Sequence, residues 1–144
     1  MSSFTVDIVT PDGVIYHHQA KFLVASTQAG SLGVLPNHSP LISPLNIDAV
    51  RIDLTEEDGG SSDWVAVNGG IIEIRDNVVS VLANSAETEH NIDVSRAEEA
   101  KERAEAKIQK AKETKDHDID LGRAEIALVR AVNRLNVANK RGRN

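Results

Sequence analysis

The sequence predicts an α+β protein: an antiparallel β-sandwich over residues 1–86, followed by an antiparallel two-helix hairpin over residues 87–144. The prediction rests on a change of composition near residue 86. All four prolines, all four aromatic residues and seven of the nine glycines precede this position. Charged residues make up 13 of the first 86 residues but 25 of the last 58. Turn-rich, aliphatic sequence is typical of β-structure, and sequence rich in Ala, Glu, Lys and Arg is typical of long helices.

The first 86 residues contain short runs in which apolar and polar residues alternate, as they do in half-buried strands. The first run, residues 4–9, ends at the turn sequence Pro11-Asp12-Gly13, in which proline presets φ and glycine accepts a positive φ. Gly69-Gly70 is interpreted as a turn or a bulge between two strands. Short strands separated by such turns indicate an antiparallel sandwich or a flattened barrel. The other expected strands lie within residues 21–25, 50–54, 64–67, 71–74 and 78–82.

The last 58 residues predict two helices. Asp93 is expected to cap the first helix, because its carboxylate can accept hydrogen bonds from amides of the first turn. The charged run 110–118 interrupts the apolar pattern and is expected to hold the turn between the helices. Since alanine buries little surface, a hairpin with alanine-rich stripes is expected to be marginal alone and to dock elsewhere. The stripes consist of Ala97, Ala100, Ala104, Ile108 and Ala111, and of Leu121, Ala124, Leu128, Ala131, Val132, Leu135 and Ala138.

Composition excludes several classes of protein. Without cysteine there is no disulfide scaffold, thiol nucleophile or cysteine-ligated metal, and a net charge of -6 argues against a nucleic-acid partner. Residues 22–47 carry no charge, but three prolines and two glycines interrupt them, so they are not expected to span a membrane. The five histidines lack metal-ligand spacing, and no phosphate-loop or nucleophile motif occurs. We therefore expect neither a metal nor a catalytic site; a hydrolase using His38 would lack a nucleophile.

Four arginines are the most informative charged residues. Arg96 and Arg103 are seven residues apart, and Arg130 and Arg134 are four apart, so each pair lies on one helical face. If the hairpin closes, the beginning of the first helix lies beside the end of the second, and the four arginines meet. Guanidinium groups suit phosphate oxygens, so the cluster could hold a polyphosphate. Alternatively, each arginine pairs with a nearby carboxylate, for example Arg103 with Glu99.

Over essentially its whole length, the chain resembles the epsilon subunit of bacterial F-type ATP synthase. The resemblance is carried by VTPDG at residues 9–13, by GSLGVLPNHSPL at residues 30–41 and by Gly69-Gly70 before an aliphatic strand. It implies a ten-stranded sandwich in a non-catalytic rotor subunit at the cytoplasmic face of the bacterial cell membrane. Such a subunit binds the gamma subunit and the c-ring and couples proton translocation to ATP synthesis and hydrolysis. The residues implied in these contacts are Ser31, Leu32, Gly33, Val34, Pro36, His38 and Pro40.

Some members of that family also sense ATP through a motif at the beginning of the first helix, which reads IDVSRA at residues 92–97 here. The resemblance implies that ATP, as a regulatory ligand rather than an obligatory cofactor, holds the hairpin closed. Without ATP, the helices would extend along gamma into the alpha/beta catalytic hexamer and block hydrolysis. The residues implied in ATP binding are Glu87, Ile92, Asp93, Arg96, Ala97, Arg103, Arg130 and Arg134.

The chain differs from the family in a longer connector, residues 110–116, and in a basic tail, residues 140–143. The tail is expected to favour the extended state by pairing with acidic catalytic-subunit surface. Two other interpretations stay open. The helices could be purely structural, without nucleotide sensing. In a different class, the chain could be a free-standing β-sandwich adaptor or ligand-binding module.

Overall fold

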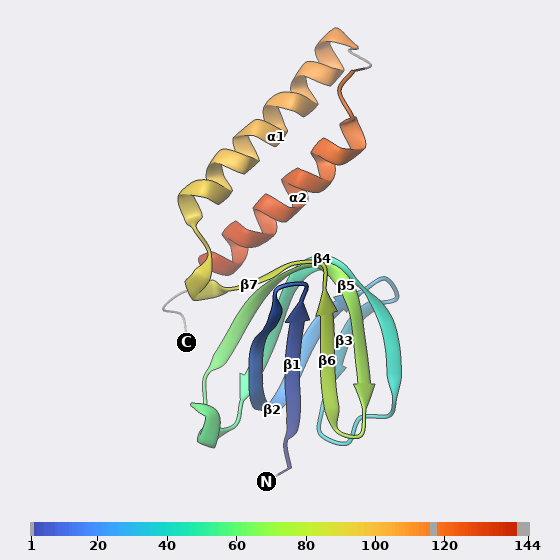
Figure 1. Ribbon diagram of the computed structural model, residues 1–144, viewed down its shortest axis with the longest axis vertical. Helices are drawn as coiled ribbons and strands as arrows, with labels where there is room; N and C mark the ends of the chain where they lie inside the picture. Colours follow the sequence, from blue (N-terminus) through green and yellow to red (C-terminus); the bar gives the residue numbers. More distant parts are fainter. Residues whose placement is uncertain (1, 116–117, 141–144) are drawn as a thin grey trace.

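The computed structural model describes residues 2–115 and 118–140, which form a β-sandwich with a two-helix hairpin at one end (Figure 1). The N-terminus lies at the end of the sandwich farthest from the hairpin. The strands are β1 (Phe4–Thr10), β2 (Gly13–Thr27), β3 (Gly30–Val34), β4 (Leu41–Leu54), β5 (Ser62–Arg75), β6 (Val78–Ala83) and β7 (Ala86–Thr88). The helices are η1 (Glu56–Asp58), η2 (Glu89–Asn91), α1 (Val94–Thr114) and α2 (Leu121–Ala138). β7 therefore crosses the expected domain boundary at residue 86.

The strands close on themselves as a flattened barrel. Their order is β1-β6-β5-β4-β2-β3, and an additional pairing between β1 and β2 completes the ring, while β7 pairs with β5. Every pairing is antiparallel except that of β1 with β6, which is parallel. A parallel pair needs a long connection, which the intervening strands β2 to β5 provide here. The expectation of a purely antiparallel sandwich was therefore wrong at this one pairing.

The described residues form seven strands, where ten were expected. The reason is that the long strands bend from one partner to another, so that each takes the place of two shorter ones. β2 pairs with β1 over Gly13–Ala20 and then with β3 and β4. Its pairing with β4 shifts register between Ala20 and Phe22 and again between Val24 and Thr27. β5 pairs with β7 over Val65–Val67 and with β6 over residues 70–75. The change of partner in β5 occurs at Gly69 and Gly70, which have positive φ angles of 79° and 133°.

The core of the barrel is aliphatic, as the low aromatic content predicts. Inward-facing residues alternate with outward ones along β1, where Phe4, Val6 and Ile8 are buried and the residues between them are half-buried. The alternation seen in the sequence thus places one face of each strand inside. The largest fully buried side chains are Phe4, Ile8, Leu23, Ile52, Ile72, Ile74, Val6, Val34, Val50, Val65, Val67 and Val79.

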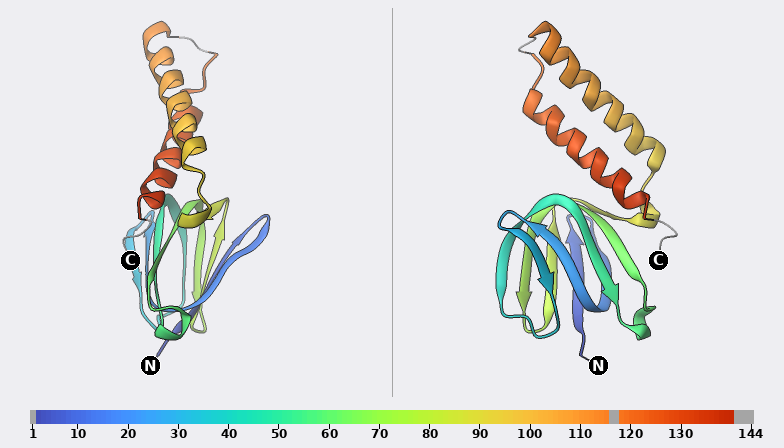
Figure 2. Two further views of the ribbon diagram at one scale, coloured as in Figure 1. Left: turned by 90° about the vertical axis from the view of Figure 1, so that its left-hand side faces the viewer. Right: turned by 180° about the vertical axis from the view of Figure 1, so that it is seen from behind.

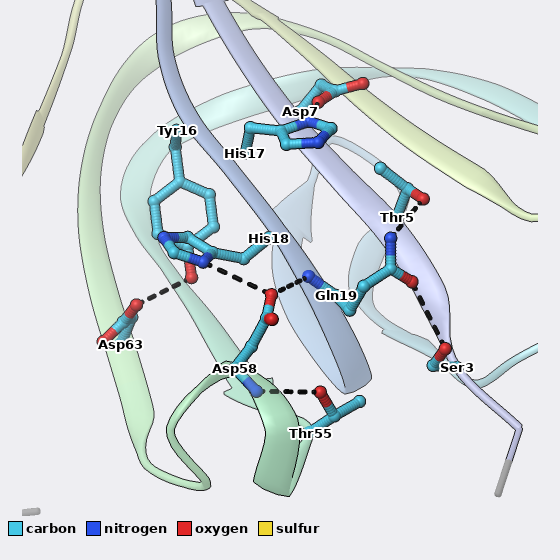
Figure 3. Close-up of polar contacts among 10 residues, drawn as sticks. All are labelled: Ser3, Thr5, Asp7, Tyr16, His17, His18, Gln19, Thr55, Asp58 and Asp63. Carbon is cyan, nitrogen blue, oxygen red and sulfur yellow. Dashed lines mark hydrogen bonds and ion pairs between the residues drawn. The ribbon is translucent and has the colours of Figure 1, made fainter.

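Polar side chains fasten η1 to the outer surface of β2 (Figure 3). The Asp58 carboxylate accepts a hydrogen bond from the backbone N–H of Gln19 at 2.6 Å and lies 3.4 Å from His18 Nδ1. Tyr16 donates to Asp63 at 2.7 Å, and burial together with this carboxylate raises the pKa of Tyr16 well above its usual range. These contacts hold the acidic loop tip against the barrel, a role that its polar sequence alone does not indicate.

An ion pair on β4 makes stability depend on pH. Burial raises the pKa of Asp53, but hydrogen bonds from Arg51 at 2.8 and 2.9 Å and from Ser62 at 2.6 Å lower it more, so the net shift is downward. A lowered folded-state pKa stabilises the protein above the unfolded value of 3.8, and this stabilisation is lost as pH falls through the folded value. Asp53→Asn should therefore cost about 1 kcal/mol at neutral pH, measured by urea unfolding.

At about pH 2 the Asp53→Asn variant and the parent chain should differ less than at neutral pH, because the carboxylate is then protonated in both states. Asp48→Asn, an exposed carboxylate on the same strand, is the control and should show neither effect. An equal loss of stability for Asp53→Asn at both pH values would contradict this assignment.

Both helices begin at an aspartate. Asp93 accepts from the Arg96 amide at 3.1 Å, which confirms the expected cap, and Asp120 accepts from the Arg123 amide at 3.0 Å. The end of α1 at Thr114 falls within the run 110–118, where the turn was expected, although the first residues of that run continue the helix. Lysine and glutamate are good helix formers, so a charged run without apolar residues does not by itself end a helix. The helix ends at Lys115, which has a left-handed φ of 50°.

The hairpin meets the barrel mainly through the C-terminal end of α2 (Figures 1 and 2). Val137 and Ala138 are buried against Ala66 of β5 and Ile92. The buried Asn133 side chain donates to the Val67 carbonyl at 3.3 Å. α1 packs along α2 and lies farther from the sheet. The hairpin is therefore attached by a small apolar contact at one end, as an alanine-rich hairpin requires.

Candidate functional site

A cavity of about 470 Å³ lies at the base of the hairpin, where β7, η2 and both long helices meet. Its size is in the range of small-molecule sites in proteins. The chain reaches this point three times: at the last strand, at the beginning of α1 and at the end of α2. The cavity is lined by Glu87, Asn91, Asp93, Arg96, Ala97, Ala100, Arg103 and Arg134.

Six of the eight residues implied in ATP binding line this cavity, and two do not. Ile92 is 4% exposed and belongs to the apolar cluster beneath the hairpin. Arg130 is exposed and lies one helical turn, about 5.4 Å, before Arg134 on α2. Its side chain is not among those that line the cavity. The structure thus brings together three of the four arginines. The six lining residues are Glu87, Asp93, Arg96, Ala97, Arg103 and Arg134.

The three arginines of the cavity differ in their partners. Arg134 Nε donates to Glu87 Oε1 at 2.7 Å, which joins α2 to β7. Within the described residues, Arg96 and Arg103 form no ion pair, so the alternative pairing of Arg103 with Glu99 is not formed there. The cavity therefore holds two guanidinium groups without carboxylate partners and a third that is already paired. This arrangement can bind an anion, in competition with Glu87 for Arg134.

The residues implied in partner contacts lie along β3 and the loop that follows it. Ser31, Gly33 and Pro40 are exposed, and Leu32, Pro36 and His38 are half-buried. Val34 is fully buried in the barrel core, which puts its side chain out of reach of a partner at the surface.

Hydrogen bonds fix the loop at residues 35–40 to the end of the barrel farthest from the hairpin (Figure 1). The backbone N–H of Asn37 donates to Asn77 Oδ1 at 2.8 Å, and Asn77 Nδ2 donates to the Ser3 carbonyl at 2.6 Å. Leu35 is 61% exposed on this loop. The loop therefore presents an apolar side chain from a backbone that is already ordered.

An apolar surface that the sequence patterns did not reveal crosses five strands. The strand registers place its members side by side, and the exposed fractions are 65% for Val14, 49% for Leu82 and 45% for Ile71. The signal lies in adjacent apolar pairs such as Val81-Leu82, since one member of each must face outward. An exposed apolar patch on an ordered sheet marks an interaction surface. We define this apolar row as Val14, Val9, Leu82, Ile71 and Pro44.

The described residues contain no candidate metal site. Within residues 2–115 and 118–140, no three histidine, aspartate or glutamate side chains are grouped so as to hold a metal ion. His17 pairs with Asp7 and His18 lies beside Asp58, so the adjacent histidines have separate partners (Figure 3). Neither described helix combines the length and the apolar character that crossing a membrane requires. The cavity at the base of the hairpin, the loop at residues 35–40 and the apolar row are the features on which a function is proposed below.

Comparison with known proteins gives matches over nearly the whole chain. The family model of the ATP synthase, Delta/Epsilon chain, beta-sandwich domain matches residues 3–89. The model of the long alpha-helix domain of the same chain matches residues 90–139. Two similar solved chains come from mitochondrial ATP synthases. One, from the OSCP/F1/c-ring of Euglena gracilis, has a TM-score of 0.76 and 23% identity and covers 96% of this chain and 82% of that one. The other, from the central stalk and c-ring of Tetrahymena thermophila, has a TM-score of 0.53 and 15% identity. It covers 94% of this chain and 93% of that one.

Proposed function

Because the chain belongs to the ATP synthase delta/epsilon chain family, we propose that it is a non-catalytic rotor subunit of the central stalk. In this role it transmits rotation between the c-ring and the catalytic part of the synthase and so couples proton translocation to ATP synthesis and hydrolysis. It is a peripheral component at the cytoplasmic face of the bacterial cell membrane, and the complex rather than this chain is the enzyme. Both similar solved chains come from assemblies with a c-ring, which supports the proposal.

Two surfaces support the assignment of partners. The apolar row lies on the outside of the barrel in a sheet that needs no rearrangement to bind, and it is assigned to the gamma subunit. The loop at residues 35–40, with exposed Leu35 and half-buried His38, lies at the opposite end from the hairpin and is assigned to the c-ring. A subunit with contacts at two separate surfaces can link two parts of a rotor.

The cavity at the base of the hairpin is the observation that carries the regulatory part of the proposal. Its three arginines suit the phosphates of ATP, while Ala97 and Ala100 leave room beside α1. The Arg134–Glu87 ion pair has to open or share its guanidinium when a nucleotide binds, which lowers the affinity. ATP carries one more phosphate than ADP, so it should gain more from the arginines.

Binding of ATP in this cavity would favour the docked hairpin. The lining residues come from β7, from the beginning of α1 and from α2, so a ligand there contacts both domains at once. A ligand that prefers one of two states shifts the population toward it by its difference in affinity. We therefore assign ATP as a regulatory ligand of the docked state. The undocked helices would extend toward the alpha/beta catalytic hexamer and inhibit ATP hydrolysis.

The test is a calorimetric titration of the full chain with ATP and with ADP. Arg96→Gln and Arg134→Gln should each weaken ATP binding by about tenfold or more, since a charge-assisted hydrogen bond contributes roughly 1.5–3 kcal/mol. Lys101→Gln is the matched control, because Lys101 lies on α1 outside the cavity and pairs with Glu105. No binding at millimolar ATP, or equal weakening by the control, would contradict ATP sensing.

Arg130→Gln tests whether Arg130 binds ATP, as the resemblance implies, or does not, as its absence from the cavity lining indicates. The resemblance assigns Arg130 to ATP, whereas its side chain lies outside the cavity of the docked structure. Unchanged ATP affinity would restrict the site to the cavity-lining arginines. A loss as large as that of Arg134→Gln would mean that α2 turns or shifts when ATP binds.

The structural interpretation of the hairpin remains as a second candidate, because the Arg134–Glu87 ion pair already joins α2 to β7 without a ligand. In that case the helices stabilise the stalk and ATP has no effect on them. A free-standing adaptor would differ from both candidates, since it should not copurify with the membrane-extracted synthase. Copurification from membranes therefore tests the rotor assignment separately from ATP binding.

A further inference from the structure

A second cavity lies between the helices, farther from the barrel than the first. It measures about 640 Å³ and is bounded by both helices and by residues 118–120. Alanines form much of its wall on both helices, and their small side chains leave space between the two helices. We call this cavity the distal cleft and define it by Arg103, Lys107, Lys110, Arg123, Ala104 and Ala124.

The distal cleft is rich in cations. Arg103, Lys107 and Lys110 are spaced at i, i+4 and i+7, so they lie on one face of α1, and Arg123 comes from the first turn of α2. Within residues 2–115 and 118–140 none of these four side chains forms an ion pair. Four cations line this one cleft although the chain as a whole carries a net charge of -6.

The carboxylates nearby offset this charge only in part. Asp118 and Asp120 are the acidic residues among those that line the cleft. The Asp120 side chain already accepts a hydrogen bond from the Arg123 amide, as the cap of α2. The amino end of α2 also directs its partial positive charge toward this region. The local potential therefore favours an anion.

We propose that the distal cleft binds a small phosphate-bearing anion, such as pyrophosphate, at a site separate from the nucleotide cavity. The guanidinium groups suit phosphate oxygens in a bidentate geometry, and lysines add point charges around them. A volume of about 640 Å³ between the two helices suits a small molecule.

The two cavities are neighbours, because Arg103 and Ala100 line both of them. The proposal does not depend on ATP sensing, since Lys107, Lys110 and Arg123 belong to the distal cleft alone. The proposal predicts, however, that ATP and the anion in the distal cleft weaken each other's binding, because Arg103 cannot bind both fully at the same time. An anion in the distal cleft would also bridge α1 and α2 and hold the hairpin closed far from the sheet.

The test is calorimetric titration of the full chain with pyrophosphate, with ³¹P NMR as a second measure of binding. Lys107→Gln/Lys110→Gln should weaken pyrophosphate binding by about tenfold or more and leave ATP affinity nearly unchanged. The matched control is Lys101→Gln/Lys112→Gln, which removes the same charge from the same helix outside the cleft. Arg134→Gln should do the opposite: it should weaken the binding of ATP but not the binding of pyrophosphate.

A titration in saturating ATP distinguishes free pyrophosphate from the phosphates of a nucleotide. If the sites are separate, pyrophosphate still binds, with an affinity reduced because Arg103 is shared. Complete displacement of pyrophosphate by ATP, together with its loss in Arg134→Gln, would overturn the proposal by moving the anion to the nucleotide cavity. Equal weakening by the control pair, or no binding at millimolar pyrophosphate, would overturn it as well.

Discussion

Replacing Val137 with aspartate should release the helical hairpin from the β-barrel. Val137 is fully buried between α2 and β5, where it packs with Ala66 and Ile92. An ionised carboxylate without a partner at this position costs several kcal/mol, which exceeds what the small apolar contact contributes. Undocking avoids that cost by moving the carboxylate into water. We therefore expect the helices to leave the sheet while the barrel stays folded.

The protein contains its own reporter for this change. Trp64 is the single tryptophan, it packs against the cluster around Val137, and the Lys140 ammonium lies 4.6 Å from its ring centre. In Val137→Asp, the fluorescence of Trp64 should shift toward that of a solvated indole. Hydrogen exchange should accelerate across residues 121–138, with the barrel strands still protected.

Ile126→Asp is the matched control, because Ile126 lies on the same helix but is 47% exposed and does not line the pocket between α2 and β4. It should change neither Trp64 fluorescence nor hydrogen exchange. If Val137→Asp behaved like Ile126→Asp, the apolar cluster would not be what holds the hairpin. In the assembled synthase, a released hairpin is expected to increase inhibition of ATP hydrolysis whatever the ATP concentration. That result would connect the docking contact to the proposed regulation.

Replacing Gly70 with alanine should destabilise the barrel more than any other small substitution considered. Gly70 has φ = 133°, and a Cβ there would lie 2.1 Å from the Leu82 carbonyl oxygen. The atom in its way belongs to the backbone of β6, which cannot move without disrupting the ladder. Backbone strain and the clash together should cost about 3–5 kcal/mol in the free energy of unfolding.

Gly30→Ala separates the two contributions to that cost. Gly30 has φ = 122°, similar to Gly70, but no heavy atom lies within 4 Å of its added Cβ. Urea unfolding should therefore show a loss of only about 1–3 kcal/mol, which is due to backbone strain alone. Equal losses at the two positions would mean that β6 moves aside and that the clash contributes little.

Local patterns predicted much of the fold. Period-two alternation places Phe4, Val6 and Ile8 in the core, and the Asp93 cap depends only on residues within one turn. The number of strands could not be predicted in this way, because whether a long strand bends or ends depends on its partners. The charged run 110–118 indicated where the turn lies but not the last residue of α1, since charge alone does not break a helix.

For the candidate site, too, the sequence predicted some features and not others. Helical spacing and, through the family resemblance, the IDVSRA sequence predicted one cluster of four arginines, of which Arg96, Arg103 and Arg134 line the cavity. Spacing along one helix could not show that Arg130 does not line the cavity, because that depends on how α1 and α2 are placed against each other. Nor could it show that Arg134 pairs with Glu87, 47 residues earlier in the chain.

The sequence by itself determined the two parts of this protein, the aliphatic character of its core, the Asp93 helix cap and the residue types of its candidate anion site. These depend on composition, on period and on contacts within a few residues. Only the tertiary structure decided which outward apolar residues form one row, which arginines share a cavity, and that the hairpin docks through the C-terminal half of α2. The physical reason is that these features depend on strand register and helix placement, which are set by contacts between residues far apart in the chain.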